Sequence, residues 1–266
     1  MDSMFFSIVI PTFNRADLLK VALHSALNQT DFDDFEVVVV DDCSNDGTWS
    51  YLQSVASPRL RILRNEPRLG MGLNWKKAID ASRGRFIYIL QDDDCALPQL
   101  LPVSASLVNR YNTDLVCFAT CLVDAAGQNP EMYWQPPREA LVPAPHALLQ
   151  FASHWTLSSS QVVFARALYE RHAGFDLTTP IFSDAETILR WMVDADTVLY
   201  PDPLALRRRW PGSVSSQTQH STAMAETMKS LVHSVLRHAT ASKKLDDREI
   251  ASLEAALKRS FLGAPL

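Results

Sequence analysis

Short, uninterrupted apolar runs alternate with helix-length segments through the first half of the chain, and this alternation constrains the fold most strongly. The runs are FFSIVI (5–10), FEVVVV (35–40), LRIL (60–63) and RFIYIL (85–90). A continuous apolar run indicates a strand buried on both faces, as in a parallel sheet. Apolar residues recur every three or four positions between the runs, which is typical of helices, in segments 15–28, 46–55 and 71–82.

This order predicts an α/β fold: a doubly wound, mostly parallel sheet flanked by helices. Right-handed crossovers would place helices on both faces, and ligands would bind at the carboxyl ends of the strands. In the second half we expect a strand at 160–165 and helices at 166–173, 184–195, 221–240 and 246–260. We divide the 266 residues into a ligand-binding half (1–112), a second half of the same domain (113–216) and a C-terminal helical extension (217–266).

Composition excludes several classes of protein. A net charge of -5 offers no general attraction to nucleic acid, which we do not expect as a partner. The four cysteines lack the spacing of a metal site and the density of a disulfide scaffold, so we expect a cytoplasmic protein. No segment reaches the ~20 apolar residues that span a bilayer. The C-terminal helical patterns suit a solvated face or a homodimer contact better than peripheral docking at the inner face of the membrane.

Three polar clusters follow three of the apolar runs directly. They are PTFNR (11–15), DDCSNDG (41–47) and QDDD (91–94). Because the carboxyl ends of parallel strands meet at one edge of a sheet, we expect the clusters to form a single site.

The run Asp92, Asp93 and Asp94 needs a balancing cation, because neighbouring carboxylates repel one another and raise each other's pKa. Oxygen ligands favour Mg²⁺ or Mn²⁺, and Mg²⁺ commonly shares its coordination sphere with substrate phosphates. The run therefore predicts a nucleoside diphosphate nearby. The plain alternative is a solvated acidic turn. Likewise, Asp41 and Asp42 suit either a turn or, for one of them, acceptance of the imide N–H of a uracil or thymine base.

Taken together, these segments resemble the family-2 glycosyltransferases with the GT-A fold. The resemblance covers about residues 6–215 and rests on SIVIPTFNR (7–15), VVVVDDCSNDGT (38–48), NWKKAIDASRGRFIYILQDDD (74–94), VVFARALYERHAGFD (162–176), SDAETILRW (183–191) and RRRWPGSVSS (207–216). Several of these motifs are degenerate singly, but their order and spacing are specific.

The resemblance implies roles for residues in the first half. Pro11, Phe13 and Arg15 would line the nucleotide pocket, with Phe13 stacking on the base. Asp42 would accept the base N–H while Asp41 supports the loop. Lys76 would lie near the phosphates.

The resemblance also makes Asp93 the main ligand of a Mn²⁺ or Mg²⁺ ion. Asp94 would be a further ligand, and Asp92 would lie near the ribose or phosphate. Gln91 stands where the family often has an aspartate. This departure leaves open which of the three carboxylates touch the ion.

In the segment SDAETILRW, the resemblance makes Asp184 the catalytic base. Glu186 would be its helical companion, and Arg190 would form a structural ion pair. The alternative for Ser183 or Asp184 is a helix cap. Ser183 replaces the acidic residue that usually comes before the base.

RRRWPGSVSS corresponds to a loop that closes over the diphosphate in relatives, and Trp210 stands where many of them have a histidine. Arg208 or Arg209 could supply the charge instead, because guanidinium groups pair well with phosphate. A solvated arginine run is the equal alternative.

The resemblance implies an inverting glycosyltransferase that moves sugar from a nucleotide sugar, most readily a UDP-sugar, to a hydroxyl of a glycan or lipid-linked acceptor in surface polysaccharide synthesis. The sugar and acceptor would meet the region around Trp134, 155–160 and Phe182. Two alternatives stay open: a metal-dependent sugar nucleotidyltransferase, although PTFNR has no glycine-rich phosphate loop, and a noncatalytic nucleotide-sugar-binding protein. His146, His154, His172 and His220 show no metal-ligand spacing with one another.

Overall fold

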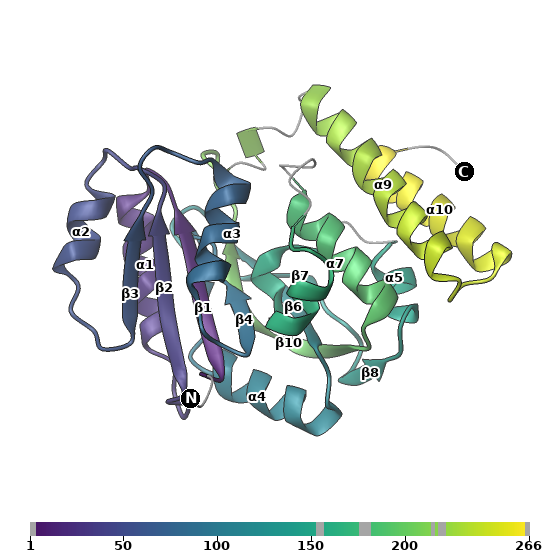
Figure 1. Cartoon of the computed structure of the whole chain (residues 1–266), viewed down its shortest axis with the longest axis horizontal. Helices are drawn as coiled ribbons and strands as arrows, with labels where there is room; N and C mark the ends of the chain where they lie inside the picture. The colour runs from purple at the N-terminus through teal and green to yellow at the C-terminus, as the bar shows by residue number, and fades with distance from the viewer. Residues whose placement is uncertain (1–3, 153–156, 176–181, 214–215, 218–221, 264–266) are drawn as a thin grey trace.

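A computed structural model of the chain describes residues 4–152, 157–175, 182–213, 216–217 and 222–263. Figure 1 shows a central sheet with helices packed around it and a pair of helices at the C-terminal end. The elements share one hydrophobic core, which runs from Phe6 in the first strand to Phe261 in the last helix.

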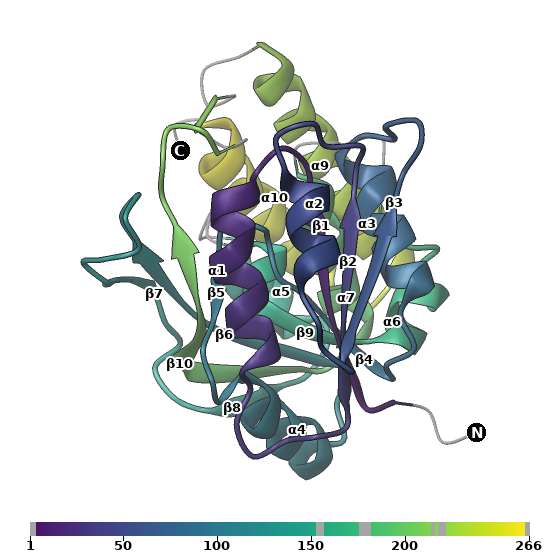
Figure 2. The ribbon, with the colours of Figure 1, turned by 90° about the vertical axis from the view of Figure 1, so that its left-hand side faces the viewer.

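The first half is the predicted alternation of strands and helices. Its elements are β1 (Phe6–Thr12), α1 (Ala16–Leu27), β2 (Phe35–Asp41), α2 (Thr48–Ser54), β3 (Leu60–Arg64), α3 (Met71–Ala81) and β4 (Phe86–Ile89). The four strands pair in parallel in the order β3-β2-β1-β4. Helix α1 covers one face of these strands and α3 the other (Figures 1 and 2). The predicted α/β fold is confirmed.

Strand β3 differs from the prediction of burial on both faces. All five of its residues are only partly buried, because β3 is an end strand of the sheet and has a neighbour on one side only. Its charged residues find partners there: Arg61 Nη1 lies 3.0 Å from Glu36 Oε2 on β2. For this strand, the prediction of two buried faces was wrong.

The second half continues the same sheet with mixed pairing. Its elements are β5 (Cys95–Ala96), α4 (Leu100–Tyr111), β6 (Leu115–Val123), β7 (Glu131–Trp134), β8 (Ala140–Val142), α5 (His146–Phe151), the 3₁₀ turn η1 (Ser159–Gln161), β9 (Val162–Ala165), α6 (Arg166–Arg171), α7 (Ser183–Asp194) and β10 (Thr197–Arg208). Strand β9 lies between β4 and β6 and is antiparallel to both. The long pairing of β6 with β10 is parallel. The sequence predicted β9, α6 and α7 but not the long strand β10 or the short strands β5, β7 and β8.

Two C-terminal helices, α9 (Thr222–Ser242) and α10 (Asp247–Leu262), complete the described chain. Asp246 begins α10 with a capping box, in which its carboxylate accepts a 2.8 Å hydrogen bond from Glu249 N. Helix α9 packs on α7, and α10 packs on α9 (Figure 1). Within the described residues, no helix is both long enough and apolar enough to cross a bilayer.

Candidate active site

The turns after β1 and β2 are joined by reciprocal hydrogen bonds. Asn14 N donates to Ser44 Oγ at 2.8 Å, and Asn14 Oδ1 accepts from Asn45 N at 2.8 Å. Asp46 accepts from Ala16 N at 3.1 Å at the start of α1. These contacts hold Arg15, which lies between Asn14 and α1, at the carboxyl edge of the sheet.

Asp42 organises the segment that follows β3. Its Oδ1 accepts from Asn65 Nδ2 and Leu69 N, each at 2.8 Å. Its Oδ2 accepts from Gly70 N at 2.8 Å, and Gly70 has a φ of +85°, a conformation in which glycine carries little strain. Asp41 is fully buried and accepts from Ser44 N, which agrees with the loop-supporting role expected for it. The contact of Asp42 with a base stays a prediction.

Arg68 covers the aromatic ring on which we expect a base to stack. Its guanidinium carbon lies 3.7 Å from the centre of the Phe13 ring, and its Nε lies 3.6 Å from Asp42 Oδ2. The Arg68 side chain is 58% exposed, so it can move without disturbing the core. The sequence gives no signal for Arg68, because this residue stands in a loop with no motif of its own.

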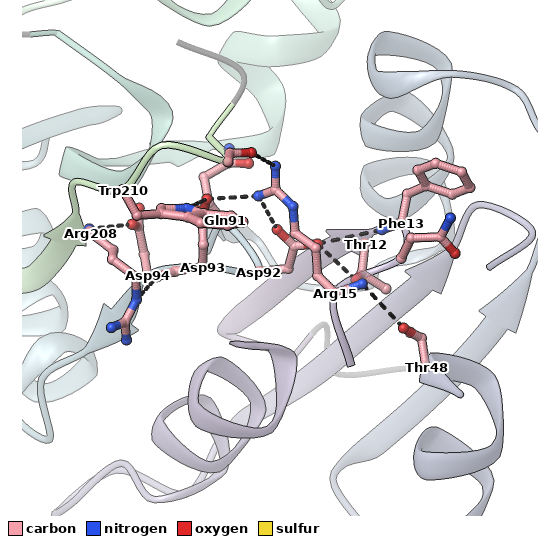
Figure 3. Close-up of polar contacts among 12 residues, drawn as sticks. Thr12, Phe13, Arg15, Thr48, Gln91, Asp92, Asp93, Asp94, Arg208 and Trp210 are labelled. Carbon is pink, nitrogen blue, oxygen red and sulfur yellow. Dashed lines mark hydrogen bonds and ion pairs between the residues drawn. The ribbon is translucent and has the colours of Figure 1, made fainter. Parts of the chain in front are cut away.

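Asp92 is held by the loop after β1. Thr12 Oγ1 donates to Asp92 Oδ2 at 2.8 Å, and Arg15 Nη1 lies 3.0 Å from Asp92 Oδ1. The same Arg15 nitrogen lies 2.7 Å from Asp93 Oδ2, so one guanidinium bridges two of the three aspartates (Figure 3). Trp210 Nε1 also donates to Asp93 Oδ2, at 2.9 Å, and the Arg15 guanidinium lies 5.3 Å from the Trp210 ring. The three polar clusters therefore meet, as the topology predicted.

Asp94 turns toward the second half of the chain. Its Oδ2 accepts from Ser160 Oγ at 2.5 Å, and its Oδ1 accepts from Arg208 N at 2.9 Å. Protein donors therefore engage both oxygens of Asp94, as they do for Asp92. Within the described part of the chain, Asp93 Oδ1 has no such donor, so it is the carboxylate oxygen of the three that is free to meet a ligand.

Burial raises the pKa of Asp92 to about 6, with Arg15 opposing and Asp93 adding to the rise. Burial also raises the pKa of Asp94 to about 7, where the charge of Asp93 adds to the effect and the Ser160 hydrogen bond opposes it. The protein's own cations thus leave part of this negative charge unbalanced. A divalent cation fits such a group of oxygen donors.

Asp184 is the second residue of α7 and is half-buried. Its Oδ2 accepts from Ser159 N at 3.0 Å, and burial raises its pKa while this hydrogen bond opposes the rise. The neighbouring Ser160 binds Asp94, and Gln91 Nε2 donates to Ser159 Oγ at 2.8 Å. The turn η1 therefore touches both Asp184 and the aspartate run.

Helix α7 begins at Ser183, so Asp184 lies within its first turn instead of capping it. Glu186, one turn into the helix, is fully buried and pairs with Arg190 Nε at 2.7 Å. The ion pair expected for Arg190 is present. Glu186 also accepts a 2.6 Å hydrogen bond from Ser234 of α9, which links α7 to the C-terminal helices.

The remaining predicted residues lie in varied settings. Arg208 Nε donates to the Asp93 carbonyl at 2.9 Å, and Arg208 Nη1 donates to the Ala125 carbonyl at 2.8 Å. The Arg208 side chain therefore joins two backbone segments. Arg209 is 61% exposed and lies near Glu131. Lys76 pairs with Asp80 at 2.5 Å on the outer side of α3. Pro11 is buried within β1.

Sequence reasoning missed three groups that hold the aspartates: Thr12, Ser160 and the Trp210 indole. Thr12 belongs to the cluster PTFNR (11–15), and its place at the strand end is a signal that points to it. Ser160 belongs to the segment 155–160, which we expect to meet the sugar, and Trp210 stands where many relatives have a histidine. Their hydrogen bonds span 80, 66 and 117 residues of sequence.

The sequence profile of glycosyl transferase family 2 matches residues 7–170, more than half of the chain. The chain belongs to glycosyltransferase family 2. The match includes the segments that hold Arg15, Asp42 and the three aspartates, and it ends before Asp184 and Trp210.

Several curated proteins are similar to this family-2 chain. An uncharacterised protein of Mycobacterium tuberculosis is 29% identical over 218 residues, which are 76% of this chain and 66% of that protein. A GalNAc(5)-diNAcBac-PP-undecaprenol beta-1,3-glucosyltransferase of Campylobacter jejuni is 35% identical over 125 residues, 46% of this chain and 39% of that enzyme. The putative colanic acid biosynthesis glycosyl transferase WcaA of Escherichia coli is 28% identical over 193 residues, 71% and 66% of the two chains. The chain thus spans between about two-fifths and two-thirds of these relatives.

Among solved structures, residues 1-349 of S. aureus TarS in complex with UDP-GlcNAc superpose with a TM-score of 0.75 at 21% identity. The superposition covers 96% of this chain and 71% of that one. The same TarS segment in complex with UDP gives a TM-score of 0.74. At this identity the likeness concerns the fold, and it confirms the predicted GT-A architecture of the family-2 chain.

Proposed function

We propose that the chain transfers a sugar from a UDP-sugar, with inversion, to a hydroxyl of a glycan or lipid-linked acceptor in surface polysaccharide synthesis. The observation that carries the proposal is the link between the two acidic groups. Ser159 N donates to Asp184 and the adjacent Ser160 Oγ donates to Asp94, so one turn contacts both the proposed base and the aspartate run in a family-2 chain. Two relatives support this substrate class by their names, an undecaprenol-linked beta-1,3-glucosyltransferase and a putative glycosyl transferase of colanic acid biosynthesis.

Asp184 acts as the base in this proposal. Its half-buried carboxylate takes the proton of the acceptor hydroxyl while that oxygen attacks the anomeric carbon. The bond from the anomeric carbon to the diphosphate breaks in the same step, and the nucleoside diphosphate leaves with the bonding electrons. The raised pKa of Asp184 makes it a stronger proton acceptor than an exposed aspartate.

Asp93 would be the main ligand of the Mn²⁺ or Mg²⁺ ion, and Asp94 would join it by sharing an oxygen that already accepts from Ser160 or Arg208. The free oxygen of Asp93 and the charge left unbalanced around Asp92 and Asp94 support this assignment. When bound, such an ion stabilises negative charge on the diphosphate of the donor. Arg15 and Trp210 fix the orientation of the Asp93 carboxylate from the other side.

Phe13 and Asp42 would bind the nucleoside, and Arg68 would close over it. Arg68 already contacts both residues, so this exposed side chain has to move before a base can stack on Phe13. An arginine beside a base adds a planar cation to the stack. Loop residues 65–70 are held by Asp42, which keeps Arg68 within reach.

The test is product analysis with a panel of UDP-, dTDP- and GDP-sugars, Mn²⁺ and short glycan or prenyl-diphosphate acceptors. Release of UDP with a β-linked product from an α-linked donor supports the proposal. Release of pyrophosphate would instead mean nucleotidyl transfer, and binding without turnover would mean a noncatalytic protein. Asp184→Asn identifies the base, and Asp17→Asn is the matched control, because the Asp17 side chain is 95% exposed.

A further inference from the structure

A second group of ligand-type side chains lies at the opposite end of α7 from Asp184. His172 follows α6, Asp194 is the last residue of α7, and His238 lies on α9. The three ligand atoms lie within 4.8 Å of one another. Ten residues, or about 15 Å of helix, separate Asp184 from Asp194. We propose that His172, Asp194 and His238 form a binding site for a transition-metal ion such as Zn²⁺. This site is distinct from the edge of the sheet that holds Asp92, Asp93 and Asp94, which we call the carboxylate edge.

The spacing of the three side chains suits a small metal ion. Asp194 Oδ2 lies 2.7 Å from His238 Nε2 and 3.7 Å from His172 Nε2. Ligand atoms of a tetrahedral zinc site lie roughly 3.4 Å apart, given bonds of about 2.1 Å. The two distances fall on either side of this value, so side-chain adjustments bring the ligands into place.

The burial of His172 Nε2 without a hydrogen-bond partner in the described part of the chain is not explained by an ion pair with Asp194 alone. The His172 side chain is only 7% exposed, and its Nε2 has no hydrogen-bond partner among the described residues. A buried polar atom without a partner is costly, and a bound ion would satisfy it. Burial lowers the pKa of His172, and the charge of Asp194 only partly opposes this. Neutral imidazole is the form that binds metals.

Asp194 is oriented for such a role. Lys244 Nζ lies 2.9 Å from Asp194 Oδ1 and donates to the Val193 carbonyl at 3.0 Å. Hydrogen bonds of this kind, made to the other oxygen of a ligating carboxylate, typically fix its orientation in metal sites. They leave Oδ2 facing the two histidines. The competing explanation is a simple cluster of ion pairs around Asp194, which would need neither a metal nor His172.

The site opens into a cavity of about 510 Å³ lined by His172, His238, Ser234, Arg190 and Arg237 among others. The side chains of His238 and Asp194 are 31% and 25% exposed, so an ion can enter and solvent can complete its coordination. The charge of Arg190 is balanced by Glu186. Two imidazoles and one carboxylate favour Zn²⁺ over Mg²⁺, the reverse of the preference of an all-carboxylate edge.

An ion bound here would tie α9 to the catalytic domain. His238 and Ser234 lie one turn apart on the same side of α9, and Ser234 already donates to Glu186 of α7. The metal would strengthen the existing contact of His238 on α9 with Asp194 of α7, and would join both to His172, whose ring already lies 5.7 Å from that of His238. We therefore expect metal binding to stabilise the docking of the C-terminal helices.

The test uses the whole chain, stripped of metal by a chelator that is then removed, with excess Mg²⁺ to occupy the carboxylate edge. Zn²⁺ is titrated in competition with a chromophoric chelator, and Co²⁺ is followed by its visible absorption. We expect one ion per chain, a higher melting temperature with Zn²⁺, and affinity at least ten-fold weaker in His238→Gln and in Asp194→Asn. His233→Gln is the matched control, because His233 is exposed on the same helix.

His238→Gln guards against a folding artefact, since His238 is partly exposed and its replacement leaves the core unchanged. Loss of Zn²⁺ binding in this variant, with retained melting behaviour in the absence of metal, supports the site. The proposal is overturned if the unaltered chain binds Zn²⁺ no more tightly than His238→Gln and Asp194→Asn do. If Zn²⁺ bound elsewhere on the chain, the three proteins would also bind it equally tightly, and this result too would overturn the proposal.

Discussion

Nη1 of Arg15 lies 2.7 Å from Oδ2 of Asp93, across 78 residues of sequence. The negative charge of the three neighbouring aspartates has to be balanced by a cation. The Arg15 guanidinium, which comes from the loop after β1, balances part of that charge. In the proposed function, a divalent ion would balance the negative charge that this guanidinium leaves. Figure 3 shows the contacts of the Arg15 guanidinium with both Asp92 and Asp93.

Arg15→Ala should destabilise the chain by about 3 kcal/mol in the absence of divalent cations, because it leaves two buried carboxylates without their charged partner. Added Mg²⁺ should restore more stability to this variant than to the unaltered chain. Urea unfolding with and without Mg²⁺ measures both effects. Arg15→Lys, which keeps the charge, is the control, and equal stability of Arg15→Ala and the unaltered chain would contradict the prediction.

Stability without divalent cations should fall as the pH rises from about 4 to about 8. The pKa values of Asp92 and Asp94 are raised to about 6 and about 7, so the folded chain binds protons more tightly than the unfolded chain. This contribution is complete below about pH 4 and is lost as the pH rises through the two raised values. Melting temperatures in EDTA across this range measure the effect.

Asp94→Asn provides a sharper version of the pH experiment. The variant keeps the shape of the side chain and removes one buried charge, so near pH 8 it should be more stable than the unaltered chain by on the order of 2 kcal/mol. Its stability should also depend less on pH. A pH profile as steep as that of the unaltered chain would show that Asp94 does not titrate in this way.

Asp184→Asn should lower kcat by about 10²- to 10⁴-fold with little change in melting temperature, because it removes the proton acceptor but keeps the hydrogen bond from Ser159 N. In the unaltered chain, activity should fall as the pH drops through the raised pKa of Asp184, since only the ionised form accepts a proton. Steady-state rates of UDP release at several pH values measure both. Turnover at the unaltered rate in Asp184→Asn would remove this residue from the mechanism.

Phe13→Ala should weaken UDP binding about ten-fold, because stacking of a base on an aromatic ring contributes ~1–3 kcal/mol. Phe13→Tyr keeps the ring and should bind UDP as the unaltered chain does. Isothermal titration calorimetry compares the three proteins. Arg68→Ala, which uncovers the ring, separates stacking on Phe13 from capping by Arg68. Equal affinity of Phe13→Ala and Phe13→Tyr would place the base elsewhere.

Much of the fold could be predicted because its signals are local. Each apolar run and each helical repeat lies within one segment, so β1, β2, α1 and α7 appear close to their expected bounds. The antiparallel insertion of β9 between β4 and β6 could not be predicted, because strand order depends on which distant edges pair. The partial exposure of β3 follows from the same pairing.

The sequence by itself determined that three polar clusters, 11–15, 41–47 and 91–94, stand at strand ends. The period of a strand and the chemistry of a side chain are both properties of short segments. Only the tertiary structure decided which groups balance those acids. Arg15, Trp210 and Ser160 reach the aspartates through contacts between distant segments, and His172 meets His238 only because α9 packs against α7. Such contacts depend on how helices and strands assemble around the common core, which no spacing along the chain records.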